Sequence, residues 1–283
     1  MELPSKGAIH AVAVQIFRSV AEWLIARRLA SERLRWRVRR FEQQGFGSLL
    51  EINYPYAFIT LNVVLMVLMW LFGTSRVSGL GSIGAVSGID SYRFGAAFAP
   101  SILAGQYWRL LTAVFLHGDL MHLLFNCIAI YIIAPRIEAV YGPQRFLALC
   151  LLAGIAGNAT SIFTRAFVIG DIRPLVGASG AIFGLLGAGA IYGLRVGGTR
   201  GDEVFKFMMT WIVIGVVYSF WRGADNLAHA GGAIAGGLVA QMARPHAPSS
   251  YHRELWRGIE LGCLILIMIC FALMLHSLFT ERI

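Results

Sequence analysis

Long apolar runs separated by short polar segments make up most of this chain of 283 residues. Seven of the runs approach the roughly 20 residues that a helix needs to cross the hydrocarbon core of a bilayer. The pattern predicts membrane helices over residues 55–73, 119–134, 143–164, 178–194, 204–220, 227–243 and 256–279. The fourth run is short and rich in glycine, which membrane helices tolerate where neighbouring helices satisfy the backbone. The expected fold class is therefore an all-α polytopic membrane protein.

The composition supports this fold class. Hydrophobic residues make up 57% of the chain and charged residues only 14%, whereas soluble domains carry about 25% charged residues. The mean hydropathy is +0.67, so no separate soluble domain is needed. All four cysteines lie inside apolar runs without metal-type spacing, and we interpret them as packing residues: Cys127, Cys150, Cys263 and Cys270. We expect neither a metal nor another cofactor.

Residues 1–54 are expected to form a separate basic segment in the cytosol. Apolar residues recur there at helical spacing and a cluster of arginines follows: Ile9, Val12, Ile16, Val20, Trp23 and Leu24, then Arg27, Arg28, Arg33, Arg35, Arg37, Arg39 and Arg40. This pattern over residues 8–44 predicts an amphipathic helix at the membrane surface, and a solvated basic tail is the alternative. The net charge of +9 is interpreted as favouring contact with membrane lipid rather than with nucleic acid.

The loop charges predict how the helices are oriented. Residues 55–243 would form a six-helix core, and residues 244–283 a linker and a seventh membrane helix. With a cytosolic N-terminus, 17 Lys and Arg residues lie on the inner side and 7 on the outer side, as the positive-inside rule favours. The C-terminus is then extracytoplasmic. The second, fourth and sixth helices run inward from the outer face, and their first turns carry His122, Ser179 and His229 at a similar depth.

Polar side chains at membrane depth are costly and usually functional. Ser179 lies in the sequence Leu-Val-Gly-Ala-Ser-Gly-Ala, and its hydroxyl is a weak nucleophile unless a base removes the proton. His229 is the candidate base on a neighbouring helix. Taken singly, each residue has an ordinary alternative, the serine as a helix cap or packing residue and the histidine as a structural group.

Two stripes of small residues predict that the two helices pack closely. Gly180, Gly184 and Ala188 recur every four residues in the fourth helix. Ala228, Gly232, Gly236 and Ala240 do the same in the sixth. Such stripes allow helix backbones to approach one another, which can bring Ser179 and His229 within hydrogen-bonding reach.

Acyl transfer also needs hydrogen-bond donors aimed at the developing oxyanion. His122 and Asn126 lie four residues apart on one helix face, and the backbone N–H of Ser179 lies at a helix N-terminus. These three are the predicted oxyanion donors, and an interhelical hydrogen bond is the alternative role of the His122/Asn126 pair. Asp225 is expected in the loop outside the membrane, so the working model is a Ser-His dyad without a carboxylate.

Taken together, these residues resemble the rhomboid family of intramembrane serine proteases. The resemblance covers about residues 55–243 and implies Ser179 as nucleophile, His229 as general base, and His122 and Asn126 as oxyanion stabilisers. The positions that carry it are Trp108, Arg109, Thr112, Phe115, His117, His122 and Asn126, then Glu138 and Gly142, then Gly177, Ser179 and Gly180, and finally Ala228, His229, Gly232 and Gly236.

The resemblance implies features that the apolar pattern does not give. Residues 74–118 would include a membrane-embedded loop held by Trp108 and Arg109. The substrates would be single-pass transmembrane proteins, cut close to the extracytoplasmic boundary. Phe183 stands where some relatives have a tyrosine under the histidine ring, which keeps stacking but removes a hydroxyl contact. A seventh helix after the core favours a bacterial plasma membrane, with a eukaryotic secretory membrane as the alternative.

Three other functions compete with proteolysis. A catalytically inactive rhomboid-like protein that binds membrane clients would have lost Ser179 or His229, and both are present. A transporter commonly carries ionisable residues at mid-membrane, but all fifteen Asp and Glu residues fall in loops or at predicted helix ends. A haem or metal site on His122 and His229 lacks a third ligand.

Overall fold

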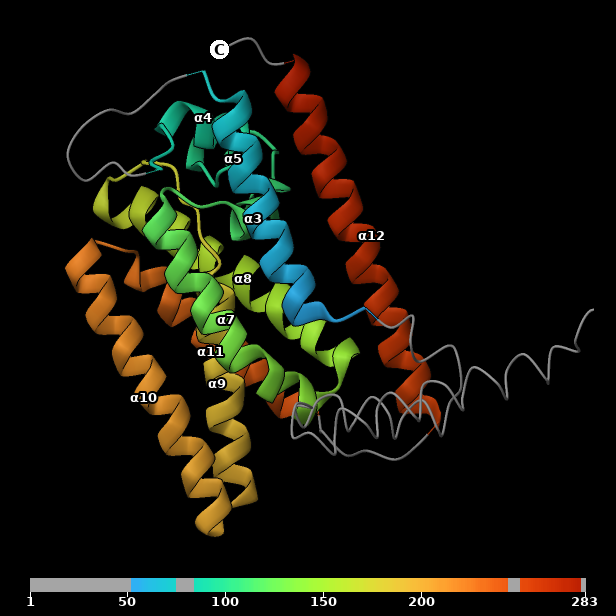
Figure 1. The fold of residues 1–283 in the computed structure, drawn as a ribbon. Coiled ribbons are helices and arrows are strands. Elements are labelled where there is room, and N and C mark those ends of the chain that lie inside the picture. The colour runs from blue at the N-terminus through green and yellow to red at the C-terminus, as the bar shows by residue number, and fades with distance from the viewer. Residues whose placement is uncertain (1–51, 75–83, 244–249, 281–283) are drawn as a thin grey trace, which may run out of the picture. The chain divides into compact units, whose positions relative to one another are not determined.

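All seven predicted apolar runs form α-helices in the computed structural model, which describes residues 52–74, 84–243 and 250–280 (Figure 1). The expected all-α fold class is confirmed, and from Tyr54 onward the chain forms one compact unit. The helices are α3 (Tyr54–Phe72), α7 (Leu120–Tyr141), α8 (Pro143–Thr164), α9 (Ser179–Val196), α10 (Gly198–Arg222), α11 (Asn226–Met242) and α12 (Ser250–Thr280). Six of the described helices are long and apolar enough to cross a membrane, and α11, with 17 residues, is the shortest of the seven. The predicted helix within residues 8–44 lies outside the described residues.

The largest difference from a predicted boundary, at the end of α7, has a local cause. Helix α7 continues through Pro135 to Tyr141, whereas the prediction ended it at residue 134. A proline removes one backbone hydrogen bond, and membrane helices tolerate this where neighbouring elements pack around them. Tyr141 is buried and donates a hydrogen bond to the Ala188 carbonyl at 3.2 Å, which holds the final turn. Gly142, at φ +81°, then ends the helix.

The chain between α3 and α7 folds into short helices from residue 84 onward. They are α4 (Gly88–Arg93), α5 (Ala99–Leu103), α6 (Arg109–Thr112) and the 3₁₀ turn η2 (Ala113–Phe115). The Arg109 side chain is fully buried at the centre of this region. Its guanidinium donates to the Tyr92 carbonyl at 2.6 Å and lies 4.1 Å from the Tyr92 ring centroid and 4.5 Å from that of Trp108. Arg109 therefore stabilises this segment through contacts made at its centre.

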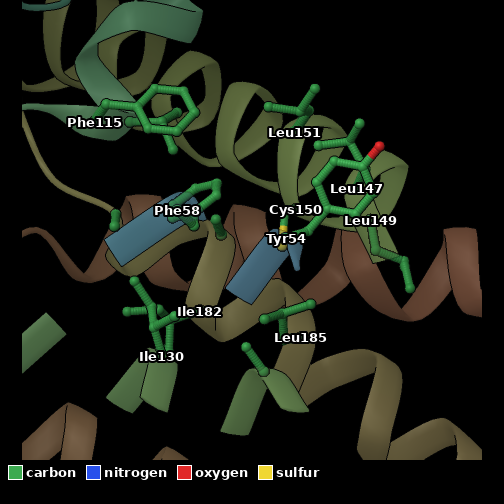
Figure 2. Close-up of a cluster of buried hydrophobic side chains, with 14 of the residues drawn as sticks. Tyr54, Phe58, Phe115, Ile130, Leu147, Leu149, Cys150, Leu151, Ile182 and Leu185 are labelled. Atoms are coloured by element: carbon green, nitrogen blue, oxygen red, sulfur yellow. The ribbon is translucent and has the colours of Figure 1, made fainter. Parts of the chain in front are cut away.

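The main core joins α3, α7, α8 and α9, and α8 is the most extensively buried of these helices. Phe58 and Phe115 pack with their ring centroids 4.6 Å apart. Figure 2 shows part of this cluster, with Tyr54, Phe58, Phe115, Ile130, Leu147, Leu149, Cys150, Leu151, Ile182 and Leu185 labelled. The four cysteines are free and at least half-buried, as expected of packing residues. This core fixes α9, which begins at Ser179.

Helices α9 and α11 approach one another backbone to backbone, so the predicted close packing is confirmed. A Cβ atom built on Gly232 would lie 2.1 Å from the Gly180 carbonyl oxygen, and one on Gly236 would lie 2.0 Å from that of Gly184. Helix α8 joins the same contact, since a Cβ on Gly157 would lie 2.6 Å from the Ala228 carbonyl oxygen. No side chain larger than hydrogen fits at these positions without moving a backbone.

Candidate active site

Ser179 is the first residue of α9, and backbone hydrogen bonds to earlier segments hold the turn that precedes it. Leu175 and Ala97 exchange backbone hydrogen bonds of 2.8 and 3.0 Å, and the Gly177 N–H donates to the Ala113 carbonyl at 2.9 Å. Gly177 has φ +138°, a conformation that favours glycine. A Cβ there would lie 2.9 Å from His122 Nε2 and 3.7 Å from Ser179 Oγ. The His122 ring and the Ser179 hydroxyl therefore both lie close to Gly177, on the side where a side chain would be.

Two cavities meet at Ser179. The larger, about 490 Å³, is lined by charged residues that include Asp119, Arg165 and Asp171. The smaller, about 70 Å³, is lined mainly by apolar side chains of α7, α9 and α10. His122, Ser179, Tyr218 and Ala224 line both, whereas His229 and Asn126 line only the smaller one. The structure thus brings the four predicted site residues, from three helices, to one small cavity that opens toward a polar one.

The His229 ring is held on two sides. Its plane stacks on Phe183 with centroids 4.1 Å apart and an interplanar angle of 4°, so the stacking expected of a phenylalanine at this position is present. Its Nδ1 atom lies 3.0 Å from Ser219 Oγ. The Nε2 atom is buried and makes no hydrogen bond within the described residues. The Ser179–His229 hydrogen bond that the sequence suggests is therefore not made in this structure.

Asn126 has a partner that the sequence analysis did not assign. Its Nδ2 donates to Nε2 of His117 at 2.9 Å, and both side chains are buried. An amide nitrogen can only donate, so Nε2 of His117 accepts this hydrogen bond with its lone pair. An amide group has two N–H donors, so one remains for a ligand.

Asp225 is occupied elsewhere and does not contact the imidazole of His229. Its Oδ1 caps α11 by accepting from the backbone N–H groups of Leu227 and Ala228 at 3.0 and 3.1 Å. Its Oδ2 accepts from Ser161 Oγ and from the Arg165 guanidinium, the latter at 3.1 Å. This carboxylate therefore anchors the start of α11 to α8, one turn before His229.

The sequence matches the family model described as Rhomboid domain over residues 104–246, about half of the chain. The chain belongs to the rhomboid family. This rhomboid is 32% identical over 190 residues to the putative rhomboid protease YdcA of Bacillus subtilis (strain 168), covering 65% of this chain and 87% of YdcA. It is also 32% identical over 193 residues to the rhomboid protease GluP of Bacillus subtilis (strain 168), covering 66% of this chain.

A third relative is the rhomboid protease AarA of Providencia stuartii, 30% identical over 176 residues, which are 54% of this chain and 62% of AarA. The rhomboid described here spans only about a third of the length of GluP, 34%. The family match and the apolar helices make it an integral membrane protein. The relatives GluP and AarA are named rhomboid proteases, and YdcA a putative one.

Ion pairs surround the larger cavity of this rhomboid. Arg222 at the end of α10 binds Asp119 at 2.8 Å, and Asp119 also caps α7 by accepting from the His122 N–H at 2.8 Å. Arg165 and Arg173 both bind Asp171. Hydrogen bonds from Arg173, with a smaller contribution from Arg165, hold the pKa of Asp171 well below its usual range. Within the described residues, no three His, Cys, Asp or Glu side chains group as metal ligands would.

The remaining predicted motif residues serve different parts of the rhomboid fold. Gly180, Gly184, Gly232 and Gly236 line the α9–α11 contact, and Trp108 and Arg109 lie in the segment before α7. Glu138 lies in α7 and lines neither cavity. Ser219 was not predicted as a site residue, and the sequence offers no distinct signal for it, since the fifth run also contains the polar residues Lys206 and Thr210.

Proposed function

We propose that this rhomboid is an intramembrane serine endopeptidase in which Ser179 is the nucleophile and His229 the general base. One observation carries the proposal. Ser179 and His229 line the same small cavity, beside a larger polar one, and Nε2 of His229 has no hydrogen-bonding partner among the described residues. Catalytic hydrogen bonds are often long in a resting enzyme and tighten when substrate binds, so the missing Ser179–His229 bond fits this role.

The reaction follows from these positions. His229 Nε2 accepts the Ser179 proton while Oγ attacks the scissile carbonyl, which gives a tetrahedral oxyanion. The imidazolium then passes that proton to the leaving amine, and an acyl-enzyme remains on Ser179. Water enters from the larger cavity, gives a proton to His229 and attacks the ester, and proton return to Ser179 Oγ releases the second product.

Three donors are proposed to stabilise the oxyanion. They are the Ser179 backbone N–H at the start of α9, the His122 ring and the second N–H of Asn126. His117 holds the first N–H of Asn126 and so restricts rotation of the amide. Removing one oxyanion donor typically costs on the order of 3 kcal/mol of transition-state stabilisation, so Asn126→Ala should reduce kcat by about a hundredfold.

The proposed substrates are single-pass transmembrane proteins, cut near their extracytoplasmic boundary. The first turns of α7, α9 and α11 carry the site, so it lies toward one end of the helix bundle. The charge distribution along the sequence favours a cytosolic N-terminus, which would place that end at the outer face. A bacterial plasma membrane is the proposed location, and an extracytoplasmic C-terminus follows from seven membrane helices.

The nucleophile is tested with a fluorophosphonate probe and a cleavage assay on candidate single-pass substrates. Ser179→Ala and His229→Ala should each abolish cleavage, and Ser179→Ala should also abolish labelling. Ser277→Ala and His276→Ala change the same residue types on α12, far along the chain from the site, and should leave both readouts unchanged. Labelling that persists in Ser179→Ala would move the nucleophile elsewhere. A wild-type protein that neither labels nor cleaves would indicate a client-binding protein instead.

The orientation is tested by cysteine accessibility in a variant without native cysteines. Tyr107 and Arg200 are both exposed; Tyr107 lies before α7 and Arg200 in the first turn of α10. A membrane-impermeant reagent applied outside should label Tyr107→Cys and spare Arg200→Cys. The reverse pattern would invert the topology and move the cleavage side to the cytosol.

A further inference from the structure

Ser219 on α10 lies within hydrogen-bonding distance of the imidazole of the proposed base, at its Nδ1 atom. It lies ten residues before His229 and its side chain is fully buried. Its Oγ lies 2.8 Å from the Gly215 carbonyl oxygen and 3.0 Å from His229 Nδ1. In the described part of the chain, this is the hydrogen-bonding partner of the imidazole.

A hydroxyl has one hydrogen, and this limits how the two contacts of Ser219 can be made. If that hydrogen points to the Gly215 carbonyl, Oγ offers only a lone pair to the imidazole, and Nδ1 must carry the proton. Nε2 then carries a lone pair. If the hydrogen points to Nδ1 instead, Nε2 carries an N–H that is buried without an acceptor. Orphaned buried N–H groups are rarer than under-satisfied acceptors, so the first arrangement is favoured.

Helix α10 also sets the position of the ring that stacks on His229. A Cβ on Gly215 would lie 2.7 and 2.9 Å from two ring carbons of Phe183. Gly215 therefore leaves the space that Phe183 occupies against the imidazole. Gly215 and Ser219 lie one turn apart on α10, and together they define the plane of the imidazole and the direction of its Nδ1 atom.

We infer that Ser219 is a positioning residue that holds His229 in the Nδ1–H tautomer, with the Nε2 lone pair facing Ser179. The inference rests on the proposed role of His229 as base. Ser219 occupies the place that a carboxylate takes in a catalytic triad, but as a neutral acceptor. When His229 gains the Ser179 proton, Ser219 Oγ continues to accept the Nδ1–H. Unlike the carboxylate of a triad, Ser219 places no second charge beside the ring.

The kinetic test compares three α10 variants. Ser219→Ala should lower kcat about tenfold to thirtyfold with little change in KM, since one hydrogen bond to the base is lost in the transition state. Ser219→Thr keeps a hydroxyl and should stay within about threefold of wild type. Thr210→Ala is the matched control, because Thr210 makes the same hydrogen bond to the carbonyl four residues earlier at 2.8 Å but lies outside the site. Wild-type kcat in a folded Ser219→Ala variant would overturn the inference.

The tautomer itself is measured on resting protein by ¹⁵N NMR of histidine-labelled wild type, with His229 assigned from its loss in His229→Ala. The expected signals are a protonated Nδ1 and an unprotonated Nε2, shifting toward a tautomer mixture in Ser219→Ala. A protonated Nε2 in wild type would overturn the inference even where Ser219→Ala fails to fold. This measurement needs no turnover, so it separates failure of the inference from failure of Ser179 as nucleophile.

Discussion

His229 belongs to α11, which packs against α9, and its ring is contacted by α10. The α9–α11 pair and helix α10 are packed into the fold in different ways. Ten of the 18 residues of α9 are buried, whereas only three of the 25 residues of α10 are, so α10 depends on few contacts. Helices α9 and α11 touch through glycine backbones. Helix α10 packs on α9 and lies at the side of the bundle away from α12 (Figure 1).

This difference separates two requirements of the site. The distance between Ser179 and His229 depends on two backbones that cannot approach further and cannot separate without losing their packing. The orientation of the imidazole depends on Ser219 and Gly215 of the less buried helix. Substitutions in the first region should therefore damage the fold, and substitutions in the second should damage turnover.

The largest effect is expected for Gly236→Ala. The added Cβ would lie 2.0 Å from the Gly184 carbonyl oxygen, and the nearest atoms are all backbone, so the helices must move apart. We expect a loss of stability of about 3 kcal/mol, toward the upper end of overpacking costs, together with loss of cleavage. Thermal unfolding in detergent measures the first and substrate cleavage the second.

Gly258→Ala and Gly262→Ala on α12 are the controls for this prediction. A Cβ at either position meets no atom within 4 Å, so both variants should keep the stability and activity of wild type. Gly180→Ala should be milder than Gly236→Ala, since its Cβ would make ordinary contacts at 3.5 Å or more. A Gly236→Ala variant as stable as the α12 controls would show that the two stripes do not limit the approach.

A smaller effect on stability, but a clear one on turnover, is expected for Gly215→Ala. The added Cβ meets the Phe183 ring rather than backbone, and the ring can shift at a cost of about 1 kcal/mol. The shift tilts the surface on which His229 stacks, so we expect kcat to fall about fivefold to tenfold. Kinetics and thermal unfolding of the same preparation test both parts. Destabilisation equal to that of Gly236→Ala would mean that α10 is packed as rigidly as α11.

The smallest effect is expected for Asp119→Asn, which removes the ion pair with Arg222 at the end of α10. Both side chains are partly exposed, and such pairs contribute about 0–1 kcal/mol. Asparagine also keeps the cap on the His122 N–H, so Asp119→Ala should cost about 1 kcal/mol more than Asp119→Asn. Unfolding at low and high salt separates the contribution of the ion pair, which salt screens, from that of the helix cap. Equal losses in both variants would assign the stability to the ion pair rather than to the cap.

The predicted helices agree with the structure because their signal is local. An apolar run long enough to cross a bilayer must satisfy its backbone internally, and a helix does so without knowledge of its neighbours. The errors arose where a local signal was overridden: Pro135 does not end α7, because Tyr141 and its contact with Ala188 hold the following turn. The predicted stripes face each other because glycine permits an approach that no other residue allows.

Hydropathy and residue spacing were enough to predict the apolar helices, the close contact of α9 with α11, and a serine and two histidines at the same end of the bundle. The contact of Ser219 with His229, that of His117 with Asn126 and the binding of Asp225 to Ser161 and Arg165 became visible only in the folded protein. The difference arises from rotation about the helix axis. In a membrane, most faces of a helix are apolar, so hydropathy does not reveal which face meets a neighbour. The partner of a single polar side chain is fixed only when all the helices pack together.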